Sequence, residues 1–143
     1  MKRGWFRTTR QRGSRRERGT AIVEFAVILP LLLAILFAII EFGYVFMIRQ
    51  SLQHAAREGC RFASLQTSTD SGILARVDEA MEPTGVSGYS VTLTHATLAD
   101  PVETVTVSIP YSDVSLVGGF FGTYSYNLTG VCSMRKEGVG GGS

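Results

Sequence analysis

A long apolar run over residues 21–40 constrains this chain more than any other feature of its sequence. At about 1.5 Å of rise per residue, a run of this length forms a helix of about 30 Å, the thickness of a bilayer's hydrocarbon core. Fourteen of its side chains are Leu, Ile, Val or Phe. At about −0.5 kcal/mol each they outweigh the cost of Glu24, which is at most about 3 kcal/mol. The sequence therefore predicts a transmembrane helix that carries one carboxylate.

Charge is distributed unevenly on the two sides of Thr20. Eight basic residues and one acidic residue precede it, whereas six basic and eleven acidic residues follow Gly19. Because positive segments stay in the cytoplasm, we expect residues 1–19 there and the rest of the chain beyond the membrane. A basic arm beside a spanning helix usually fixes topology, so we expect no nucleic-acid partner. A removed secretory signal is disfavoured, because the apolar run exceeds about 7–15 residues and no A-x-A-like site follows it.

Several short motifs accompany the apolar run. They are Gly19 followed by TAIVEF, Glu24-Phe25, Leu29-Pro30, Glu41-Phe42-Gly43, and the AAREG sequence from Ala55 to Gly59. The first resembles the processing site of type IV prepilins, and residues 23–65 resemble the TadE-like pilins and pseudopilins of the tight-adherence (Tad/Flp) pilus. The resemblance covers residues 15–66 well and residues 133–137 loosely. Cys60 departs from it, because small alanine-like residues are commoner at this position.

The resemblance implies a minor pilin or pseudopilin, which is not an enzyme and has no cofactor. A prepilin peptidase would cut between Gly19 and Thr20, leaving a new ammonium on Thr20 four residues from Glu24 and on the same helical face. Glu24 and Phe25 would then act in subunit assembly, with the carboxylate paired to the terminal amine of a neighbour or to its own. A glutamate that only snorkels to the cytoplasmic interface remains the alternative. Pro30 either kinks the helix or is a tolerated membrane proline.

The implied partners are the prepilin peptidase, other pilins or pseudopilins, the inner-membrane pilus assembly platform and membrane lipid. The implied location is the bacterial inner membrane, crossed once with a cytoplasmic N-terminus and an exterior or periplasmic head, and the surface pilus after assembly. His54 and His95 are isolated, and HExxH, CxxC and GxSxG are missing from the sequence, so a metal site or a hydrolase nucleophile is not supported. The alternative function is an uncleaved single-pass anchor whose small exterior head binds an envelope ligand.

Periodicity beyond the membrane predicts an α+β fold. A stripe of apolar and small residues extends the long helix to about residue 66, and we expect it to pack against a sheet, with a partner-binding surface as the alternative: Val45, Ile48, Leu52, Ala55 or Ala56, Gly59 and Ala63. A short helix over residues 73–81, with Ile73, Leu74 and Val77 inward, and strands over 89–95, 102–109 and 124–134 should follow. The expected domains are a leader (1–19), a transmembrane helix (20–41), its exterior extension (42–66), a small α+β head (67–137) with three or four antiparallel strands, and a flexible tail (138–143).

Three further features concern the exterior part. Phe42, Tyr44 and Phe46 lie where an interfacial aromatic belt is expected. A glycine-rich connection around residues 120–121 is either a flexible loop or an exposed aromatic tip. Cys60 and Cys132 form an even pair outside the cytoplasm, so we expect a disulfide between helix and last strand, with two buried free thiols as the alternative.

Overall fold

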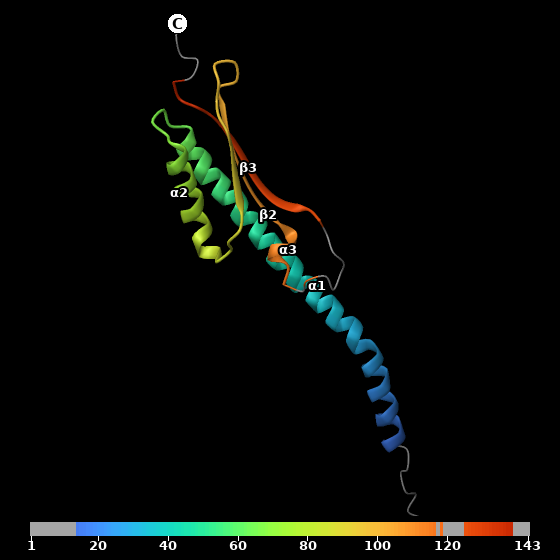
Figure 1. Cartoon of the computed structure of the whole chain (residues 1–143). Helices are drawn as coiled ribbons and strands as arrows, with labels where there is room; N and C mark the ends of the chain where they lie inside the picture. Colours follow the sequence, from blue (N-terminus) through green and yellow to red (C-terminus); the bar gives the residue numbers. More distant parts are fainter. Residues whose placement is uncertain (1–13, 117, 119–124, 139–143) are drawn as a thin grey trace, which may run out of the picture. The chain divides into compact units, whose positions relative to one another are not determined.

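The computed structural model describes residues 14–116, 118 and 125–138, without the side chains of residues 14–18 (Figure 1). The elements follow one another in the order α1 (Ser14–Ala63), α2 (Asp70–Met81), the 3₁₀ turn η1 (Glu82–Thr84), β1 (Ser90–Thr94), β2 (Val102–Pro110), α3 (Tyr111–Val114) and β3 (Asn127–Arg135). A long apolar N-terminal helix is followed by a short helix and a three-stranded antiparallel sheet. The predicted α+β class is therefore confirmed.

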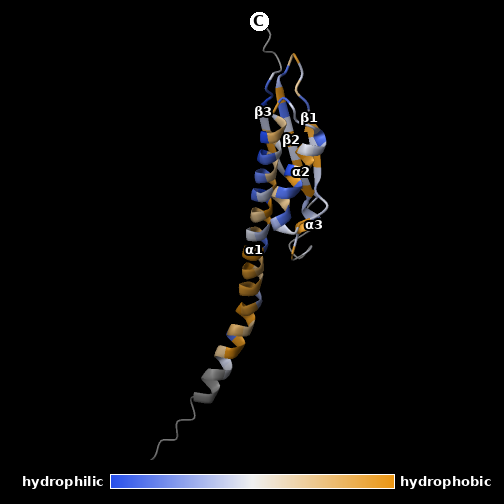
Figure 2. Cartoon of the chain, turned by 90° about the vertical axis from the view of Figure 1, so that its left-hand side faces the viewer, coloured by the Kyte–Doolittle hydropathy of each residue, from blue (hydrophilic) through white to orange (hydrophobic). Residues whose placement is uncertain are grey.

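Contacts divide the chain into two units, Met1–Phe37 and Ala38–Ser143. Apart from Glu24, residues 21–37 of α1 in the first unit are apolar, and their large side chains are exposed, with Ile22 at 68% and Val27 at 74%. Figure 2 shows this part of α1 in the hydrophobic colour. Helices apolar on every face are either buried in protein or span a membrane, and among the described residues α1 is the one helix long and apolar enough to span. The helix continues through Pro30 without a break in assignment.

The sheet has the strand order β1-β2-β3, with antiparallel pairing on both sides of β2. Burial alternates along β2, so that Val105, Val107 and Ile109 face the core while Thr106 and Ser108 between them face outward. This alternation follows from the two-residue period of a strand. It fixes the register in which Val105 pairs with Cys132 of β3.

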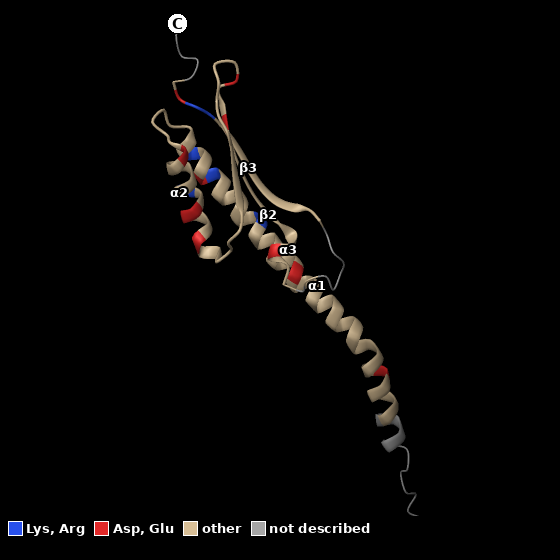
Figure 3. Cartoon of the chain, viewed as in Figure 1, with Lys and Arg blue, Asp and Glu red and all other residues tan. Residues whose placement is uncertain are grey.

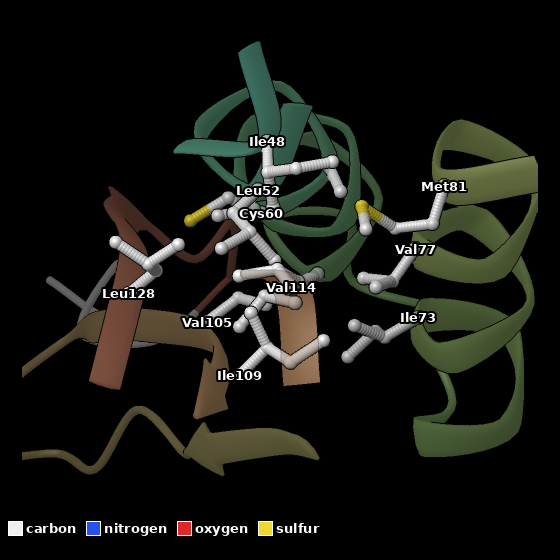
Figure 4. Packing of buried hydrophobic residues seen from close by; sticks show 14 residues of the cluster. Ile48, Leu52, Cys60, Ile73, Val77, Met81, Val105, Ile109, Val114 and Leu128 are labelled. Atoms are coloured by element: carbon white, nitrogen blue, oxygen red, sulfur yellow. The ribbon is translucent and has the colours of Figure 1, made fainter. Parts of the chain in front are cut away.

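The core of the second unit lies between the outer part of α1, helix α2 and the sheet. Figure 4 shows side chains from three elements pointing toward one another: Ile48 and Leu52 of α1, Val105 and Ile109 of β2, and Ile73, Val77 and Met81 of α2. The predicted small-residue stripe of α1 packs here, because Ala55, Ala56, Gly59 and Ala63 are buried. The prediction for α2 is correct for Ile73 and Val77 but wrong for Leu74, which is 39% exposed.

Two glycines allow α1 to approach its neighbours closely, as its stripe of small residues predicted. A Cβ on Gly59 would lie 2.8 Å from Val77 Cγ2 and 3.3 Å from Val105 Cγ1. A Cβ on Gly130 of β3 would overlap the backbone of Leu52, so only glycine lets this strand touch α1. The side-chain amide of Gln53 reinforces the contact, since its nitrogen donates to Val131 O at 2.8 Å and its oxygen accepts from Val131 N at 3.3 Å.

The structure differs from the sequence prediction in the part of the chain that follows β2. The third strand, predicted over residues 124–134, begins at Asn127 and ends at Arg135, and α3 was not predicted at all. The glycine-rich connection with its two phenylalanines, residues 120–121, lies outside the described residues.

Candidate functional site

The predicted cleavage junction lies in the first turns of α1. Gly19 and Thr20 are both helical and exposed. A Cβ placed on Gly19 would meet no atom within 4 Å, so packing does not require glycine here. Glycine in a helix interior costs about 0.8–1.0 kcal/mol relative to alanine. The residue at this position therefore weakens the helix without any packing gain in the described structure, and it leaves the backbone accessible.

Glu24 and Phe25 lie one turn further along α1 on its exposed surface. Phe25 is 58% exposed, and the neighbouring apolar side chains are exposed as well. Figure 3 shows the stretch of α1 that follows Glu24 without charged residues until Glu41. A carboxylate in such an apolar setting is costly unless it is paired. The structure thus leaves Glu24 available to a partner from outside the chain.

Glu41 is in a different environment at the outer end of the apolar run. Glu41 is only 6% exposed, and among the described residues its carboxylate accepts three hydrogen bonds from the segment around α3. Tyr111 Oη donates at 2.8 Å, Ser115 Oγ at 2.6 Å and Leu116 N at 2.9 Å. The hydrogen bond to Glu41, followed by burial, raises the pKa of Tyr111. Sequence reasoning noted Glu41 only as part of a motif and missed this role.

Glu103 is a second buried carboxylate, at the far end of β2. It is fully buried and accepts a hydrogen bond from Ala96 N at 2.8 Å; His95 Nδ1 lies at 2.7 Å and Lys136 Nζ at 3.6 Å from its oxygens. Burial by itself raises the pKa of Glu103, but the bonds with Ala96 and His95 and the charge of Lys136 lower it by more. Glu103 therefore links the loop after β1 to the end of β3 as a carboxylate.

The two cysteines come together in the core. Cys60 of α1 is buried, Cys132 of β3 is half-buried, and both are free thiols in this structure. Burial, followed by the interaction with the Cys132 side chain, raises the pKa of Cys60 to about 12. Cys60 Sγ also lies 3.7 Å from the backbone oxygen of Glu103. The fold thus brings together the pair that the sequence linked, while the disulfide itself stays a prediction.

The remaining candidates do not form a reactive centre. His54 is exposed on α1, whereas His95 belongs to the Glu103 cluster and lies 3.5 Å from Asp70 Oδ2 through its Nε2. Within the described part of the chain, no three His, Cys, Asp or Glu side chains are grouped so that they could hold a metal ion. The polar clusters that do form fasten segments of the fold to one another.

Comparison with known families agrees with the resemblance noted in the sequence. A family model described as TadE-like protein matches residues 19–61. No curated protein and no solved structure matches the chain significantly. The matched residues begin at Gly19 and include Glu24, the apolar run, Glu41 and Cys60. Residues 19–61 of this chain are therefore similar to the TadE-like protein family.

Proposed function

We propose that this protein is a minor pilin or pseudopilin of a tight-adherence type IV pilus. In this proposal a prepilin peptidase cuts between Gly19 and Thr20 on the cytoplasmic face, and the processed chain contributes to pilus assembly, priming or adhesion. The observation that carries the proposal is the TadE-like match over a helix that combines Gly19, Glu24 and an all-round apolar surface.

The chemistry of the junction supports cleavage as the step that enables assembly. Cleavage removes a segment with eight basic residues and creates an ammonium on Thr20, one helical turn from Glu24. A basic segment of this kind holds a membrane protein in its original topology. Once it is removed, an apolar bundle of α1 helices can form in which Glu24 neutralises a terminal amine of a neighbouring subunit.

The test is the intact mass of the protein recovered from membranes of cells with an active prepilin peptidase. We expect a chain that begins at Thr20, and a chain that begins at Met1 when the peptidase gene is deleted. The test variant is Gly19→Ala, which keeps the helix and adds a Cβ at the cleavage position, and the matched control is Gly43→Ala. Gly43 lies on the same helix, and a Cβ there also meets no atom within 4 Å.

Processing should be reduced in Gly19→Ala and unchanged in Gly43→Ala. Recovery of only the Met1 chain from cells with an active peptidase would contradict the proposal. The protein would then be better explained as an uncleaved single-pass anchor with an exterior head that binds an envelope ligand.

A further inference from the structure

A groove of about 350 Å³ lies beside α1 just after the apolar run. Phe42, Val45 and Phe46 of α1 form one wall, and Tyr126 and Leu128 form the other. All of these residues belong to the unit Ala38–Ser143. The groove therefore lies within the second unit, along the first turns of α1 that follow the apolar run.

The aromatic walls of the groove are open to the surroundings. Phe42 is 73% exposed, Phe46 53% and Tyr126 49%. The rings of Phe42 and Phe46 stack with their centroids 6.5 Å apart, and Tyr126 stacks on Tyr111 at 5.0 Å, so both walls are preformed. Clustered exposed aromatic side chains indicate a contact surface, and at the end of a membrane span that surface is the lipid interface.

The accessible charge of the groove is positive. Arg49 is exposed and is the one cation among the described residues that line it. Glu41 lines the groove too, but its side chain is only 6% exposed and its oxygens already accept bonds from Tyr111, Ser115 and Leu116. A ligand in the groove therefore meets an apolar wall with a guanidinium at one end.

Distances along α1 place this guanidinium near the level of lipid phosphates. Arg49 is nine residues beyond Ile40, which is about 13.5 Å along the helix axis. The headgroup region of one leaflet is about 5–8 Å thick. Side chains on a helix point back toward its N-terminus, which here is the membrane end, and an arginine can extend its charge several ångströms in that direction.

We propose that the groove binds an anionic phospholipid. Its phosphate pairs with Arg49, its glycerol region lies against Val45 and Phe46, and the top of an acyl chain lies against Phe42. This inference uses the membrane anchoring of α1 and does not depend on cleavage after Gly19 or on pilus assembly. The bound lipid holds the membrane-proximal end of the head at the bilayer surface.

The test uses the full chain in nanodiscs of phosphatidylcholine that contain a phosphatidylglycerol with a photoactivatable diazirine near the top of one acyl chain. We expect crosslinks at residues 42–49 and 126–128 in excess of those that a photoactivatable phosphatidylcholine gives at the same residues, with the crosslinks along residues 21–40 as the internal standard for insertion. Arg49→Gln should lower the excess about fivefold, which corresponds to about 1 kcal/mol for one basic residue at an anionic surface.

Arg57→Gln is the matched control, because Arg57 is exposed on the same helix, eight residues further out, and does not line the groove. It should crosslink like the wild type. Equal crosslinking by both variants, or by a photoactivatable phosphatidylcholine, would mean nonspecific boundary lipid and would overturn the proposal. Displacement of the crosslink by inorganic phosphate would overturn it as well, because the site would then bind an anion without needing an acyl chain.

Discussion

Glu24 and Glu41 are both on α1, one near each end of the apolar run, and their surroundings differ. Glu41 is buried and receives hydrogen bonds from Tyr111, Ser115 and Leu116 of its own chain, whereas Glu24 is exposed on an apolar surface. A carboxylate with three donors is satisfied within the fold. We therefore assign Glu41 a role within the fold of its own chain and propose for Glu24 a role between subunits.

The exposed glutamate gives the first residue-level prediction. Glu24→Gln and Glu24→Ala should insert into the membrane at least as well as the wild type, because the cost of the carboxylate, up to about 3 kcal/mol, is removed. Assembly should fail or slow, since removing one member of a buried ion pair costs about 3–5 kcal/mol. The measurement is the amount of processed protein in sheared surface pili at matched membrane levels.

Glu17→Gln is the control for this measurement, because Glu17 lies in the segment that cleavage removes. It should assemble normally. If both Glu24 variants enter pili as well as the wild type does, then Glu24 is only a snorkelling interface residue and the pairing mechanism is wrong.

The ionisation of Glu103 should make the free energy of unfolding depend on pH. Its folded-state pKa is lower than the usual value of 4.5, so its contribution to stability is fully present above that value and is lost as the pH falls through the folded-state pKa. Glu103→Gln should lower the free energy of unfolding at pH 7 by about 1–3 kcal/mol, because it weakens a buried charge-assisted network. The difference between the two proteins should shrink as the pH is lowered below 4.5.

Denaturant unfolding in detergent micelles, followed by circular dichroism at a series of pH values, measures this difference. Glu79→Gln provides the comparison, since Glu79 pairs with Arg76 on an exposed face of α2. It should change stability by less than about 1 kcal/mol. A constant difference between wild type and Glu103→Gln from neutral to acidic pH would contradict the prediction.

At the scale of elements, the contact between α1 and β3 depends on Gly130. In Gly130→Ala the new Cβ overlaps the backbone of Leu52, which cannot rotate away as a side chain can. We expect a loss of about 1–3 kcal/mol in the free energy of unfolding, which is typical of overpacking. In Gly43→Ala the added methyl meets nothing within 4 Å, so the helix should gain up to about 1 kcal/mol. Chemical unfolding of both variants in the same detergent checks the opposite signs.

Helices and strands whose apolar or small residues repeat at a regular spacing could be predicted from the sequence. The apolar run, the small-residue stripe of α1 and the alternating strands were predicted correctly because each repeats over many residues. Helix α3 has four residues, too few to show a helical period. The role of Glu41 depends on partners 70–75 positions away, which local patterns do not specify. The signal that was available is the cost of a carboxylate at a membrane boundary, which requires a partner.

At the scale of the whole molecule, the two cysteines lie on its first and last elements, Cys60 on α1 and Cys132 on β3. In the oxidising exterior we expect a bridge between Cys60 and Cys132 that closes a loop worth about 4 kcal/mol in the chain-entropy model. Cys60 is buried and Cys132 is half-buried in the folded state, so slow alkylation of the native protein does not by itself show a disulfide. The protein should instead be alkylated after denaturation, with and without reductant, and its mass measured.

A bridged protein gains two alkyl groups only after reduction. Cys60→Ser and Cys132→Ser should each gain one without reduction, and each should be less stable than the oxidised wild type. Two alkyl groups on the unreduced, exported wild type would show that the pair stays reduced.

Gln53 protects the exposed edge of the sheet from pairing with another copy of the chain. Its side-chain amide hydrogen bonds to both the N–H and the C=O of Val131, as the backbone of another strand would. The outer edge of β3 is thus blocked at its midpoint by a single residue of α1. Unprotected edge strands pair with one another and lead to aggregation. Gln53 shields the centre of this edge, so that when many copies are concentrated on one membrane or filament, their sheets are kept from joining there.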